Sequence, residues 1–167
     1  MTDQEEEFVH FVSCIESLNN AWRLINRVKA ERGNPLIGPA FRYALVEYSK
    51  PYRGSRCNGR ERRLGISYIP ADMLALHKRV TDSRDQVQAH SDLTVMNAKL
   101  YVHEVQGQHF TGIVQNRITG FEELPNIEEV HRLIEGTLDN MYAKEEILKA
   151  ALLYQVYQAR SHCSSDS

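Results

Sequence analysis

The sequence predicts an all-α, up-and-down helical bundle with a small β-hairpin insertion at 99–114. Apolar residues recur at three- and four-residue steps through several long segments, and proline or glycine separates those segments, which indicates amphipathic helices. The hairpin is indicated by β-branched and aromatic residues on both sides of Gln106, Gly107 and Gln108. We expect one domain over 1–161, followed by a disordered polar tail at 162–167.

The first two helices have clear ends. Gly33, Asn34 and Pro35 end the first, whose apolar stripe is Phe8, Phe11, Val12, Ile15, Leu18, Trp22 and Ile25. Pro39 suits the first turn of the second helix, and Pro51 marks its end. The stripe of this second helix is Phe41, Ala44, Leu45 and Tyr48.

Two further helices are expected on either side of the hairpin. One opens at Pro70 and carries the chain to Arg84, with a side formed by Met73, Leu76, His77, Val80 and Val87. The other starts at Asn126, a capping residue, and runs toward Arg160 with Gly136 as a weak point. Its stripe is Ile127, Val130, Ile134, Leu138, Met141, Leu148 and Leu152.

Composition excludes several classes of protein. Of the 167 residues, 42% are hydrophobic and 25% are charged, which is typical of a globular domain. The net charge of -2 argues against a protein that coats nucleic acid through its overall charge. Three cysteines without Cys-x-x-Cys spacing indicate reduced thiols. The acidic N-terminus and the absence of a long apolar run predict a cytoplasmic protein without a membrane anchor.

The familiar catalytic and cofactor motifs are missing from the sequence. It contains no Gly-x-Gly-x-x-Gly, Walker loop, Gly-x-Ser-x-Gly or His-Glu-x-x-His pattern. The seven histidines show no ligand spacing, although ligands could still assemble from separate elements. We therefore expect neither a metal nor a cofactor.

A basic loop between residues 50 and 63 is a candidate RNA-binding segment. Six cationic side chains lie within it. They could bind the phosphate groups of RNA without recognising its base sequence. They are Lys50, Arg53, Arg56, Arg60, Arg62 and Arg63. The alternative is a solvated loop that the acidic N-terminus and glutamates 122, 123, 128 and 129 balance. The sequence favours neither interpretation.

The segment 84–92 contains the best candidates for catalysis. RNA can be cut without a metal if a base and an acid move protons and a cation stabilises the charge on the phosphate. His90 suits the proton transfers, Arg84 the phosphate clamp, and Asp85 could orient either. The alternative is a helix C-terminus where basic side chains cap the last carbonyls.

Helix geometry limits how these groups can meet. On a straight helix, Arg84 and His90 would lie about 120° apart and would not share a face. Either the helix breaks before His90, or two chains each contribute residues to one cleft.

This segment resembles the HEPN superfamily of helical-bundle proteins, many of which are ribonucleases in toxin, abortive-infection and CRISPR systems. The family motif is an arginine, usually followed by a polar residue, and a histidine after four to six intervening residues; Arg84, Asp85 and His90 match it. The continuation Ala89-His90-Ser91-Asp92 also looks like several branches of the family. The stretch 93–120 departs from a plain bundle.

The resemblance implies a metal-independent endoribonuclease with a toxin or defence role that forms a homodimer with a shared cleft. It also implies an antitoxin or nucleotidyltransferase as the kind of partner to expect. The alternatives are a non-catalytic HEPN-like dimer that binds RNA, a nucleotide or a partner protein, and a helical adaptor that binds only protein.

Overall fold

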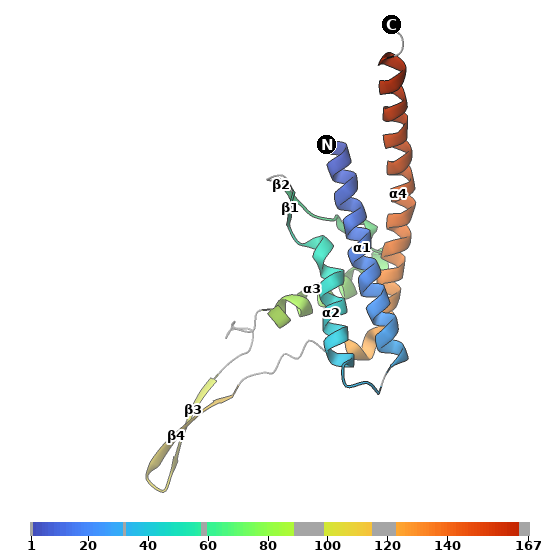
Figure 1. Cartoon of the computed structure of the whole chain (residues 1–167). Coiled ribbons are helices and arrows are strands. Elements are labelled where there is room, and N and C mark those ends of the chain that lie inside the picture. The colour runs from blue at the N-terminus through green and yellow to red at the C-terminus, as the bar shows by residue number, and fades with distance from the viewer. Residues whose placement is uncertain (1, 32, 58–59, 89–98, 115–122, 164–167) are drawn as a thin grey trace.

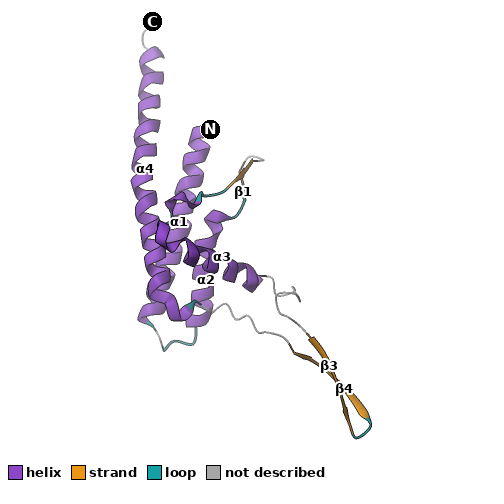
Figure 2. Ribbon diagram, turned by 180° about the vertical axis from the view of Figure 1, so that it is seen from behind, coloured by secondary structure: helices purple, strands orange, loops and turns teal. Residues whose placement is uncertain are grey.

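The computed structural model describes residues 2–31, 33–57, 60–88, 99–114 and 123–163. Helix α1 (Asp3–Ala30), helix α2 (Ile37–Ser49) and helix α4 (Ile127–Cys163) run up and down beside one another, with α1 between the other two (Figure 1). Helix α3 (Leu74–Gln88) lies across them, as the reverse view confirms (Figure 2). The prediction of a mainly helical fold with a small hairpin is confirmed.

The acidic N-terminus has a structural role. The backbone N–H of Glu5 donates to the Thr2 hydroxyl at 3.3 Å, and the Glu5 carboxylate accepts from the Thr2 backbone N–H at 2.6 Å. This capping box satisfies amide groups that the first turn of a helix cannot pair internally. Asp3, Glu5 and Glu6 also place negative charge at the positive end of the α1 dipole.

The core joins the apolar faces of all four helices. Its largest fully buried side chains include Leu18 and Ile25 from α1, Phe41 and Tyr48 from α2, and Ile134 from α4. The predicted stripe of the second helix is buried throughout, and Leu76 and Val80 of α3 complete the interior. Each helix therefore depends on the others to remove its apolar face from water.

The prediction of the apolar stripe on α1 is wrong for Val12, which keeps 36% of its surface exposed, and for Trp22. Trp22 keeps 36% of its surface exposed, and Ala21 beside it is fully buried. The indole N–H of Trp22 donates to the Glu135 carboxylate of α4 at 3.1 Å, and its ring lies 6.1 Å from the ring of His131. Trp22 thus seals the edge of the α1–α4 interface, while a small alanine lets α1 pack closely inside it.

Gly136 does not interrupt α4, although it was expected to be a weak point. A Cβ atom at this position would lie 2.8 Å from Cγ of Pro70, just before the 3-10 turn Ala71–Met73 that leads into α3. The glycine therefore allows close approach of this turn to α4. The helix continues to Cys163, two residues into the segment expected as a tail, and 164–167 lie outside the described residues.

Two antiparallel hairpins complete the described chain. Strands β3 (Lys99–Val105) and β4 (Gln108–Val114) form the predicted hairpin, whose turn places Gln106 and Gly107 at positive φ. This hairpin projects from the helices, and its apolar side chains, such as Leu100 and Ile113, are exposed (Figure 1). Strands β1 (Ser55–Cys57) and β2 (Arg60–Arg62) form a smaller hairpin where the sequence predicted only a loop.

Candidate functional site

Arg84 is the one predicted catalytic residue whose side chain the structure describes. It is half-buried on α3. Asp85 follows it in the same helix, and its side chain is outside the described set. His90 lies in the segment 89–98, which the structure does not describe, so the geometry between Arg84 and His90 stays a prediction.

Arg84 is close to a residue of the predicted basic loop. Burial and the nearby positive charge of Arg53 lower the pKa of the Arg84 guanidinium. Arg53 directly follows the 3-10 turn Lys50–Tyr52 at the end of α2. Since an arginine stays charged at any working pH, two positive charges from different elements are held near one another. Such a like-charge pair is a common feature of sites for anions.

His77 lies on the same side of α3 as Arg84. The two residues are seven positions apart, so they differ by about 20° around the helix and about 10 Å along it. Helical side chains tilt toward the N-terminus, and the long Arg84 side chain therefore extends back toward the turn that carries His77. His77 belongs to the apolar side that the sequence predicts for this helix, and that pattern gives no sign of its position beside Arg84.

Tyr48 and Tyr52 hold the His77 imidazole in place. The Tyr48 hydroxyl and Nδ1 of His77 are hydrogen-bonded at 2.8 Å. The Tyr52 ring packs against the imidazole with centroids 4.5 Å apart and planes at 70°. No hydrogen-bond partner of Nε2 is found in the described part of the chain. His77 contacts Tyr52, and Arg84 lies near Arg53, the next residue in the chain. One face of α3 therefore lies against the end of α2.

Burial lowers the pKa of His77 despite the opposing charge of Asp82. Folding therefore favours the neutral imidazole, and the unfolded chain binds more protons as pH falls below about 6.5. We expect the free energy of unfolding to decrease between pH 7.5 and pH 5, and to decrease less steeply in a His77→Gln variant. Urea denaturation at several pH values measures how the free energy of unfolding of each protein depends on pH. Equal pH dependence in wild type and His77→Gln would show that His77 does not cause it.

Three residues of the predicted basic loop are already paired with carboxylates. Lys50 binds Glu47, Arg62 lies 3.5 Å from a carboxylate oxygen of Glu6, and Arg63 binds Glu61. The side chains of Arg56 and Arg60 lie outside the described set. Arg53 belongs to the same segment, and its charge acts on Arg84.

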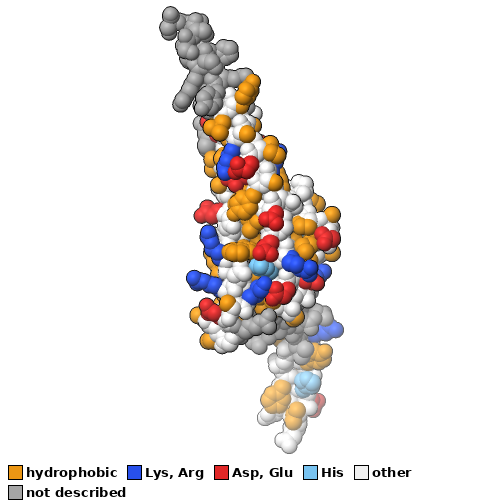
Figure 3. Space-filling model, turned by 90° about the vertical axis from the view of Figure 1, so that its right-hand side faces the viewer, with side chains coloured by type: hydrophobic (Ala, Val, Ile, Leu, Met, Phe, Trp, Pro, Cys, Tyr) orange, Lys and Arg blue, Asp and Glu red, His pale blue; other side chains and the backbone are white. Residues whose placement is uncertain are grey.

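Positive charge is also scattered elsewhere. On the face shown in Figure 3, lysine and arginine side chains alternate with aspartate and glutamate over the bundle. Binding of a polyanion therefore depends on local groups of cations. Among the described residues, no cluster of three or more histidine, cysteine, aspartate or glutamate side chains could hold a metal ion. In the same part of the chain, no helix is both long and apolar enough to cross a membrane.

A polar cleft lies between the first half of α1, strand β2 with the segment after it, and α4. It measures about 470 Å³, and its polar lining includes His10, Arg62 and Lys144. Burial and the charge of Arg62 lower the pKa of His10, while burial raises the pKa of the neighbouring Cys14 thiol to about 11. Neutral imidazole and protonated thiol make this pair a poor nucleophilic site at neutral pH.

No family model, curated protein or solved structure matches this chain. The resemblance of 84–92 to the HEPN motif therefore remains a hypothesis based on the residues themselves.

Proposed function

We propose that this chain is a HEPN-like, metal-independent endoribonuclease in which Arg84 clamps the scissile phosphate and His90 transfers protons. The proposal is supported above all by the position of Arg84, half-buried on α3 and near the second guanidinium of Arg53. Two cations at one place suit a phosphodiester, and an arginine fork can hold two of its oxygens at once.

The chemistry requires few groups. A base removes the proton of the 2′-hydroxyl, whose oxygen attacks the phosphorus, and an acid protonates the departing 5′-oxygen as its bond to phosphorus breaks. The products are a 2′,3′-cyclic phosphate and a free 5′-hydroxyl. Arg84 stabilises the negative charge that grows on the phosphate oxygens, and Asp85 orients the guanidinium or the imidazole.

Helix geometry leads us to propose a homodimer as well. Residues six positions apart on one helix do not face the same point, whereas two copies of the segment across a two-fold axis can. A toxin or defence role, with an antitoxin or nucleotidyltransferase partner, is part of the same proposal and follows from the family resemblance.

The proposal is tested by incubating the full chain with varied end-labelled RNAs in excess EDTA. We expect cleavage that produces 2′,3′-cyclic phosphate ends, and no cleavage of a strand that carries 2′-deoxyribose throughout. The deoxy strand is the matched control because it lacks only the attacking oxygen. RNA that is bound but not shortened would instead favour the non-catalytic HEPN-like dimer, and cleavage that EDTA abolishes would contradict a metal-free mechanism.

A further inference from the structure

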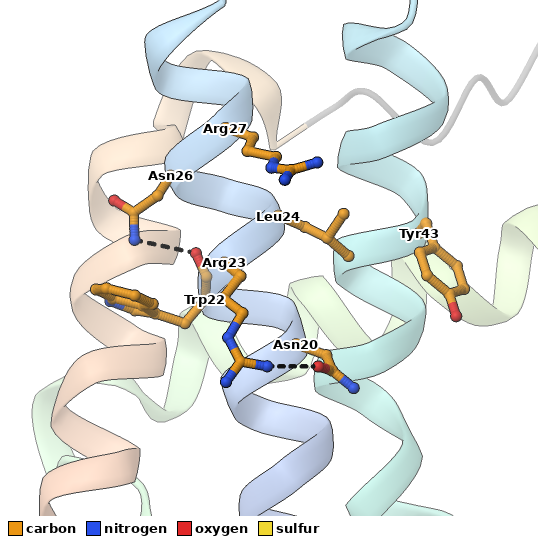
Figure 4. Close-up of a pocket in the computed structure, with 7 residues that line it drawn as sticks. All are labelled: Asn20, Trp22, Arg23, Leu24, Asn26, Arg27 and Tyr43. Atoms are coloured by element: carbon orange, nitrogen blue, oxygen red, sulfur yellow. Dashed lines mark hydrogen bonds between the residues drawn. The ribbon is translucent and has the colours of Figure 1, made fainter.

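A groove on the outer face of α1 contains a second group of cations, remote in sequence from Arg84. It measures about 490 Å³ and is lined by Asn20, Trp22, Arg23, Leu24, Asn26, Arg27 and Tyr43. Figure 4 shows Arg23 and Arg27 on α1, with Trp22 on the side of α4 and Tyr43 across on α2. The groove therefore joins two guanidinium groups with aromatic and amide side chains from two helices.

Arg23 and Arg27 differ from most basic residues of this protein because no carboxylate neutralises them. The Arg23 guanidinium donates to the side-chain oxygen of Asn20 at 3.2 Å, and neither Arg23 nor Arg27 forms an ion pair within the described residues. Several other described cations have carboxylate partners. Examples are Lys29 with Glu128, Lys78 with Asp82, Arg79 with Glu123, and Lys149 with Glu145 and Glu146.

This arrangement carries a cost for the isolated helix. Arg23 and Arg27 are four residues apart, so they are neighbours on one face of α1, and like charges at this spacing destabilise a helix. An anion bound between them would relieve that repulsion. The two backbone positions are about 6 Å apart along the helix, so long arginine side chains from them can bind one phosphate or two successive ones.

The other lining groups favour nucleic acid over an acidic protein as the anion. Asn20 and Asn26 offer amide groups, and the exposed ring of Tyr43 offers a flat surface on which an unpaired base can stack. Trp22, whose ring is stacked with that of His131, adds the part of its surface that remains exposed. Carboxylate side chains would satisfy the arginines but would leave the aromatic surfaces unused. A single-stranded nucleic acid uses all three kinds of group.

Tyr43 also links the groove to the Arg84 region. The ammonium group of Lys50 lies 5.8 Å from the centre of the Tyr43 ring, and Lys50 precedes Arg53 by three residues. Lys50 is paired with Glu47, so Tyr43 and Lys50 connect the groove to the end of α2 that faces α3 by their position and add no unpaired positive charge. A strand lying along this path would contact both places.

We propose that the Arg23–Arg27 groove is an RNA-binding exosite that holds single-stranded RNA away from the site of cleavage. The inference rests on the proposed function in taking RNA as the ligand. The groove lies outside the basic loop at residues 50–63, so it is an additional RNA-binding surface. It can be tested by measuring RNA binding in the absence of cleavage.

The test uses a fluorescein-labelled, 2′-O-methylated RNA of about 12 nucleotides, which cannot be cut because its 2′-oxygens are blocked. Its affinity for the full chain is measured by fluorescence anisotropy over a range of salt concentrations. Loss of one single-strand phosphate contact lowers the salt slope by about 0.7, which is roughly fourfold in affinity at 0.15 M salt. We therefore expect the Arg23→Gln/Arg27→Gln variant to bind roughly tenfold more weakly, with a slope reduced by about 1.4.

The matched control is Arg132→Gln/Lys149→Gln, which removes two positive charges from α4, where both side chains are exposed beside glutamates. This control should bind the RNA nearly as well as the wild type. Equal loss of affinity in the two double variants, or none in either, would overturn the exosite. If the wild type binds the RNA and the groove variant does not, the exosite is supported even if the protein cuts no RNA. The binding test therefore distinguishes a failure of the exosite from a failure of the cleavage proposal.

Discussion

Arg84→Ala is expected to slow RNA cleavage about 100- to 1000-fold, the usual loss when a group that stabilises developing negative charge is removed. Arg84→Lys should recover only part of the rate, because an ammonium group keeps the charge but cannot hold two phosphate oxygens in the planar geometry of a guanidinium. Single-turnover cleavage with saturating enzyme measures the chemical step, and circular dichroism checks that each variant remains helical.

His90→Ala provides the companion measurement. If Arg84 and His90 act on the same phosphate, their contributions are not independent, and the double variant should be hardly slower than either single variant. Arg132→Ala is the control for loss of an exposed helical arginine, since Arg132 lies on α4 beside Glu129. A fully active Arg84→Ala variant, or losses in the two single variants that simply multiply, would argue against a shared site.

The helices could be predicted because the signals that define them are local. Pro39 and Pro51 bracket α2 within two residues of its observed ends, and the four-residue stripe between them is buried. The projecting hairpin was also predictable, since its β-branched strands flank a Gly-containing turn. In both cases, neighbours in the chain determine the conformation, so the sequence pattern is sufficient.

The β1–β2 hairpin and Trp22 were not predictable in the same way. Strands of three residues that contain arginine and glutamate show no apolar alternation, and only pairing with each other defines them. Trp22 fits a three- and four-residue period as well as Ala21 does. What decides between them is the approach of α4, which leaves room for a methyl group but not for an indole.

Contacts between distant segments were also hidden. Tyr48 and His77 are 29 positions apart and meet only after α3 has crossed α2. The unpaired state of Arg23 and Arg27 depends on which glutamates α2 and α4 bring to that face. The sequence identified Arg84, but its neighbours Arg53 and His77 required the fold.

Tyr48→Ala is the stability change with the largest expected effect. Tyr48 is fully buried, packs against Tyr52 and His77, and joins α2 to α3 through its hydroxyl group. Removing a buried aromatic ring costs about 3–5 kcal/mol in free energy of unfolding, through lost burial and the cavity that remains. Urea denaturation measures this loss, and Tyr101→Ala on the projecting β3 strand should change it by less than about 0.5 kcal/mol.

Tyr48→Phe separates the ring from the hydroxyl. It keeps the packing but leaves Nδ1 of His77 without its partner, at a cost of about 1–2 kcal/mol. The variant should also perturb His77, whose NMR titration would then shift relative to wild type. If Tyr48→Phe and Tyr48→Ala destabilise the protein equally, the hydroxyl rather than the ring holds α3 against α2. If Tyr48→Phe changes neither stability nor the titration, the Tyr48–His77 hydrogen bond does not position the imidazole near Arg84.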